Sequence, residues 1–254
     1  MKSQGLDDES PVRPSGQSHS SERKVDEQSA VVGNERMTAL AGAVLLVLIL
    51  VELVSTAILH TLLSIHVFVG VLLAGPLIVK LGSTGWRFLR YYTGAPAFVR
   101  RGPPHLVLRV MAPLLIATTL VVIGSGIGLV VTGPRFAGPL LPLHGFSVLV
   151  WLPLIALHVF AHTWRVPRLV ADDWRNPSGK SNTSGRGRRL VVNLGALLVG
   201  TIAAILLFPG AAPWIVWSQT NEKIPAPLIV GLPIAALALL VARPWRMVGM
   251  DGDS

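Results

Sequence analysis

Long apolar runs alternate with short polar stretches along this chain. The first run, residues 38–81, is about twice the ~20 residues that a helix needs to cross a bilayer, so it predicts a hairpin of two spans with its turn near Ser55–Thr61. The pattern as a whole predicts an all-α polytopic membrane protein with six transmembrane helices. The expected spans are 38–56, 61–81, 105–131, 144–165, 190–208 and 226–242.

Polar segments divide the chain into units around these spans. Residues 1–36 mix seven acidic with five basic residues and are rich in Ser, Gly and Gln, which is typical of a disordered tail. The basic, Gly- and Ser-rich stretch 167–189 predicts a flexible linker. It separates a four-helix unit, 37–166, from a two-helix unit, 190–242, and residues 243–254 form a second tail.

Basic residues gather in alternate loops, which predicts the orientation of the spans. The loops on one side, with the C-terminal tail, hold Lys80, Arg87, Arg90, Arg100, Arg101, Arg109, Arg165, Arg168, Arg175, Lys180, Arg186, Arg188, Arg189, Arg243 and Arg246. The opposite loops hold only Arg135 and Lys223. We therefore expect a multi-pass protein of the plasma (inner) membrane with both termini in the cytoplasm.

Composition supports the membrane assignment and excludes several kinds of site. Of the 254 residues, 51% are hydrophobic and 14% charged, against about 25% charged in an ordinary soluble domain. A net charge of +9 would suit a nucleic-acid partner. The basic residues, however, lie between the apolar segments, as charges that set membrane topology do. We therefore expect membrane lipid as a partner and no nucleic acid. The chain has no cysteine, which excludes thiolate-ligated haem, cysteine-held iron–sulfur clusters and cysteine nucleophiles.

Two histidines are predicted to lie at similar depth in antiparallel helices. His66 lies about one turn inside the outer end of the second span, and His144 lies at the outer end of the fourth. A haem iron with two axial imidazoles needs one histidine from each of two facing helices. The pair therefore predicts haem b bound near the outer surface. The alternative is that each imidazole only hydrogen-bonds a neighbouring helix.

Two more histidines share the face of the fourth span that carries His144. His158 lies about 21 Å from His144 along the helix, and His162 follows one turn later. That separation suits a second haem rather than the same one. His158 or His162 would be one ligand and His105, at the inner start of the third span, the other. If no second haem binds, these residues are structural or contact propionates.

No motif completes a catalytic site. The sequence lacks a P-loop, a G-x-G-x-x-G fingerprint, a G-x-S-x-G elbow and H-E-x-x-H. Without a flavin or nicotinamide site, the chain is at most one subunit of an oxidoreductase system. The competing hypothesis is a haem-free membrane scaffold or transporter with structural histidines.

Three stretches resemble a known class of membrane protein. HTLLSIHVFVGVLLAGPLIVKLGSTGWRFLRYYTG, GPPHLVLRVMAPLL and LPLHGFSVLVWLPLIALHVFAH resemble the bacterial b-type cytochromes of the cytochrome b561 and ferric-reductase-like class, in their small actinobacterial form. The resemblance covers roughly residues 38–166. It implies a four-helix haem-binding bundle that carries electrons from a quinol or cytoplasmic donor to an extracytoplasmic acceptor or partner subunit.

By position, the resemblance implies that His66 and His144 are the outer haem ligands and that His158 or His162 is an inner one. The chain departs from a two-haem pattern at Lys80, where a second histidine on span two is expected. One haem is therefore expected, with two as the alternative.

Overall fold

The computed structural model describes residues 15–100, 102, 106–163, 165–175, 185–220 and 227–250, and every regular element within them is helical. The long helices are α1 (Ser15–Ala57), α2 (Leu59–Leu72), α3 (Ala74–Tyr92), α5 (Leu106–Thr132), α6 (Leu140–His162), α8 (Arg186–Leu207) and α10 (Pro227–Met250). Shorter ones are α4 (Pro96–Arg100), η1 (Pro134–Phe136), α7 (Arg165–Arg175), η2 (Phe208–Ala211) and α9 (Ala212–Thr220). The all-α prediction is confirmed.

Among the described residues, five helical stretches are long and apolar enough to cross a membrane, where the sequence predicted six. They are Glu27–Ala57, Leu59–Tyr92, Arg109–Thr132, Leu140–His162 and Arg186–Thr220. The sixth predicted span, 226–242, corresponds to the shorter apolar helix Pro227–Ala242 within α10. The membrane character of the chain is thus supported, while the count of six stays a prediction.

The first apolar run folds as the predicted hairpin. Helix α1 ends at Ala57 and α2 begins at Leu59, so the turn is at Ile58, inside the predicted interval. Thr61 and Leu62 both donate backbone hydrogen bonds to the Ile58 carbonyl, at 3.0 Å each. These bonds close the turn without glycine or proline, and α2 and α3 then pack back along α1.

Helix α1 begins at Ser15, so the segment predicted to be a disordered tail is helical over 15–36. The polar residues at its end have partners on other helices. The buried Glu35 carboxylate lies 3.1 Å from Arg165 on α7 and 3.8 Å from Arg87 on α3. Tertiary ion pairs therefore stabilise a helix that its composition alone does not favour. The predicted linker 167–189 likewise begins and ends in helix, α7 and α8.

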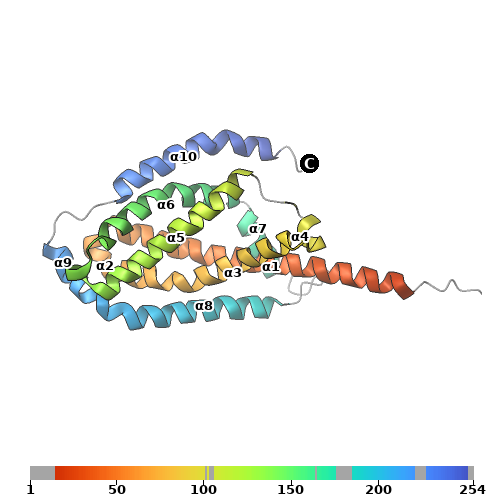
Figure 1. Cartoon of the computed structure of the whole chain (residues 1–254), viewed down its shortest axis with the longest axis horizontal. Helices are drawn as coiled ribbons and strands as arrows, with labels where there is room; N and C mark the ends of the chain where they lie inside the picture. The colour runs from red at the N-terminus through yellow and green to blue at the C-terminus, as the bar shows by residue number, and fades with distance from the viewer. Residues whose placement is uncertain are drawn as a thin grey trace, which may run out of the picture.

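The four-helix unit lies between the two C-terminal helices (Figure 1). Helix α8 packs against α2 and α3, whereas α10 packs against α6. Helix α8 approaches the backbone of the hairpin closely, because a Cβ added at Gly200 would lie 2.5 Å from the Leu72 carbonyl oxygen. The two C-terminal helices thus flank the four-helix unit on opposite sides.

This close approach predicts that Gly200→Ala is destabilising. The added methyl group would overlap a backbone oxygen, and overpacking of this kind costs about 1–3 kcal/mol. Gly195→Ala on the same helix is the matched control, since an added Cβ there meets nothing within 4 Å. Thermal unfolding in detergent, followed by circular dichroism, should show a lower Tm for Gly200→Ala alone. Equal Tm values for the two variants would contradict the contact.

Candidate functional site

The structure brings His66 and His144 together across the bundle. His66 lies on α2 and His144 on α6, and their ring centroids are 6.3 Å apart at an interplanar angle of 76°. The two rings line one cavity between the helices of the four-helix unit. The predicted outer pair is thus adjacent in space, and its role as a ligand pair stays a prediction.

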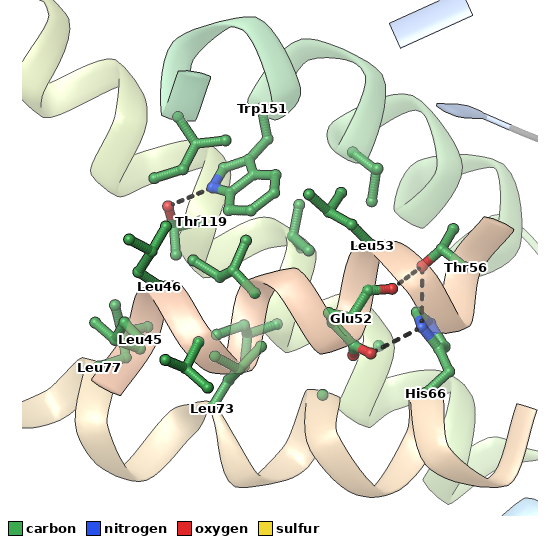
Figure 2. Close-up of a pocket in the computed structure, with 18 of the residues that line it drawn as sticks. Leu45, Leu46, Glu52, Leu53, Thr56, His66, Leu73, Leu77, Thr119 and Trp151 are labelled. Atoms are coloured by element: carbon green, nitrogen blue, oxygen red, sulfur yellow. Dashed lines mark hydrogen bonds and ion pairs between the residues drawn. The ribbon is translucent and has the colours of Figure 1, made fainter. Parts of the chain in front are cut away.

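A hydrogen bond with Thr56 and an ion-pair contact with Glu52, both on Nδ1, orient the His66 ring (Figure 2). Nδ1 lies 3.2 Å from Glu52 Oε2 and 3.2 Å from Thr56 Oγ1. The Thr56 hydroxyl already donates to the Glu52 carbonyl oxygen at 2.7 Å, and a carboxylate accepts only. Both neighbours can accept from an Nδ1–H, and in the neutral ring with this tautomer the lone pair is on Nε2.

The same argument holds for His144. Its Nδ1 lies 3.1 Å from Ser125 Oγ and 3.1 Å from the Val122 carbonyl oxygen. The Ser125 hydroxyl donates to the Val121 carbonyl at 2.6 Å, so it accepts from the imidazole. Gly126 leaves room for this ring, because a Cβ there would lie 3.2 Å from His144 Cε1. His144 Nε2 is thus also unprotonated.

These two rings fit the requirements of a bis-imidazole iron. A metal–imidazole bond is about 2 Å long and the ring centre lies roughly 1 Å beyond the nitrogen, so opposed ligands place their centroids roughly 6 Å apart. The centroid distance of 6.3 Å matches this value. Ligating histidines usually donate their other N–H to a carboxylate or a carbonyl; here His144 Nδ1 bonds to the Val122 carbonyl oxygen and His66 Nδ1 contacts the Glu52 carboxylate.

The cavity has a volume of about 970 Å³, at the upper end of the range for ligand pockets. Its walls are mainly aliphatic side chains from α1, α2, α3, α5 and α6. Trp151 lies across its middle and donates its indole N–H to Thr119 Oγ1 at 2.9 Å (Figure 2). Glu52, His66 and His144 line one end, which we call the outer end. An elongated apolar cavity with a few polar groups suits a large flat or chain-like ligand.

The opposite end of the cavity, which we call the inner end, is lined by Lys80, His158 and His162. The rings of His158 and His162 are stacked, with centroids 4.6 Å apart at 30°. They cannot be opposed ligands of one iron, because they lie side by side on one helix. Their predicted partner, His105, lies outside the described residues. The second haem therefore stays a prediction.

Several polar residues at these sites were not singled out from the sequence. Thr56, Thr119 and Ser125 supply hydrogen bonds to cavity side chains. Isolated hydroxyl residues in apolar helices are a weak signal, because such side chains also bond to the preceding turn. Gly70 on α2 lies directly beside Glu52, because a Cβ there would lie 2.7 Å from Glu52 Oε1. That glycine makes room for the carboxylate.

His60, in the outer turn, lies away from this pair and contacts the Ser218 carbonyl oxygen at 3.2 Å. Over the part of the chain that the structure describes, no group of three or more His, Cys, Asp or Glu side chains is placed to hold a metal ion. Comparisons with protein families, with characterised proteins and with solved structures found no match for this chain.

Proposed function

We propose that this chain is a transmembrane electron-transfer cytochrome that holds haem b between His66 and His144. The proposal rests on the pair of imidazoles. Their ring centroids are 6.3 Å apart, and the Nδ1 atom of each ring lies beside an acceptor oxygen. Both Nε2 atoms are left free to bind a metal. Haem bound there would supply one-electron chemistry.

The protein's own contribution is to orient and enclose the cofactor. Glu52 and Thr56 fix one ring, while Ser125 and the Val122 carbonyl fix the other. The aliphatic walls provide an apolar environment for the cofactor, and two axial imidazoles would make the iron low-spin. We propose a quinol or a cytoplasmic donor as the source of electrons, and an extracytoplasmic acceptor or partner subunit as their destination.

A reduced-minus-oxidised spectrum of the purified protein tests this function. The chain should be expressed with added haem precursor, reduced with dithionite and its haem quantified per chain. We expect a low-spin b-type spectrum and at least one haem per chain. Protein that stays colourless, and still binds no haem on reconstitution with hemin, would favour the haem-free scaffold with structural histidines.

We also propose that the chain lies in the plasma membrane with both termini in the cytoplasm, from the distribution of loop charges. Because the chain has no cysteine, maleimide can label only the single cysteine that is introduced. A cysteine at Ser181, in the 166–189 loop, should react only with membrane-permeant maleimide in intact cells, whereas one at Gln219 should also react with an impermeant reagent. The reverse pattern would overturn the orientation and place His66 and His144 near the inner surface.

A further inference from the structure

The inner end of the cavity holds the ammonium of Lys80, which no carboxylate of the described residues pairs with. Lys80 lies within the apolar hairpin, and its ammonium donates to the Thr38 carbonyl oxygen at 3.0 Å. Gly42 leaves room for it, since a Cβ there would lie 2.9 Å from Nζ. In the described residues it has no carboxylate partner. An ammonium has three donors, so Lys80 can still bind an acceptor.

Among the described residues that line the cavity, the carboxylate is Glu52, and it is too far from Lys80 to form an ion pair with it. It lies ten residues beyond Gly42 on α1, or about 15 Å along the helix, and it already contacts His66 and Ser55. A charged group in an apolar interior is costly unless an opposite charge accompanies it. The inner end is therefore electrostatically complementary to one negative charge supplied from outside the chain.

His158 and His162 add neutral hydrogen-bonding groups on the same side of this end. Both lie close enough to Lys80 to interact with its charge. His162 uses Nδ1 on the His158 carbonyl oxygen, at 2.9 Å. Within the described part of the chain, its Nε2 and the His158 ring nitrogens have no hydrogen-bond partner. His158 can thus donate one N–H to an oxygen held by Lys80, whereas the neutral His162 ring already donates its single N–H to the His158 carbonyl oxygen.

Helix α7 closes this end of the cavity. Four of its apolar side chains, Val166, Pro167, Val170 and Ala171, line the same cavity as Lys80. The helix is held in place by the ion pair between Arg165 and Glu35, at 3.1 Å. The inner end is thereby screened from water, which strengthens any charge-assisted hydrogen bond formed there.

We propose that the inner end binds the carboxylate of a long-chain fatty acid, with the alkyl chain along the aliphatic middle of the cavity. A carboxylate matches the single charge of Lys80 and offers a second oxygen to the N–H of His158. The residues between the two ends include Leu45, Leu46, Leu73 and Leu77 (Figure 2), which suit a single alkyl chain. This site does not depend on haem at the outer end.

Binding of radiolabelled laurate to the full chain in phosphatidylcholine nanodiscs tests the proposal, with empty nanodiscs correcting for partition into lipid. We expect saturable binding that excess unlabelled laurate displaces and dodecanol does not. Lys80→Met should weaken the binding at least tenfold, whereas Lys80→Arg should retain most of it. Arg135→Met, which removes an exposed cation at the outer surface, is the control and should leave the binding unchanged.

Three results would overturn the fatty-acid site. One is displacement of laurate by dodecanol as effective as by laurate itself, and another is unchanged binding in Lys80→Met. The third is a content of two haems per chain with one of them lost in His158→Phe, which would assign the inner end to haem. A colourless protein that still binds laurate through Lys80 would refute the proposed cytochrome function and leave this site standing.

Discussion

Replacing either His66 or His144 with alanine should remove the same low-spin haem completely. Each imidazole would supply one axial bond, and a six-coordinate centre needs both. The rings come from separate helices and their centroids lie 6.3 Å apart, so removal of either ring breaks the pair. The measurement is haem per chain and the reduced spectrum of each purified variant.

His60→Ala is the matched control for this pair. His60 belongs to the same hairpin but contacts the Ser218 carbonyl oxygen instead, so this variant should keep the full spectrum. Size-exclusion profiles of all three variants separate loss of haem from loss of fold. If His66→Ala or His144→Ala keeps a full low-spin spectrum, the residue replaced is not a ligand.

Removing the Glu52 carboxylate should give the second largest effect. Glu52 Oε2 lies 3.2 Å from His66 Nδ1, and loss of such a partner typically lowers metal affinity about 10–100-fold. Glu52→Leu should therefore lose haem to an external acceptor such as apomyoglobin faster than the unmodified protein does. Glu52→Gln keeps an acceptor oxygen, so it should retain haem.

The two Glu52 variants should also differ in redox potential from the unmodified protein. A carboxylate beside a ligand stabilises the more positive, oxidised centre, so Glu52→Gln should raise the midpoint potential. Glu35→Gln is the control, because Glu35 lies 17 residues earlier on α1 and pairs with Arg87 and Arg165. That variant should leave the potential unchanged. Equal haem retention in Glu52→Leu and the unmodified protein would show that the contact between Glu52 and His66 Nδ1 does not orient the His66 ring.

Hydropathy alone determined much of the architecture. The length of the 38–81 run required a hairpin, and the structure turns at Ile58. Depth in antiparallel helices was enough to predict that His66 and His144 approach each other, and their rings lie 6.3 Å apart. Both inferences use only position along the chain, because the thickness of a bilayer fixes how far along a span each residue lies.

Only the tertiary structure decided which faces of these helices meet. The spans are apolar on nearly all sides, so hydropathy marks no inward face, and only the histidine-bearing face of the fourth span is marked by periodicity. The contact of Glu52 with His66, and of Ser125 with His144, depends on the rotation of each helix about its axis. That rotation is set by close packing, of the kind that Gly200 permits against Leu72.

The polar residues near the ends of the spans also have partners that local sequence does not predict. Composition predicted a disordered segment before the first span, yet the helix there includes Glu35, whose partners Arg87 and Arg165 lie 52 and 130 residues away in sequence. Only in the folded bundle does Lys80 line the same cavity as His158 and His162. Local sequence determined where helices enter the membrane, whereas contacts between distant residues decided which polar groups face one another, because an apolar helix has no preferred face until it packs.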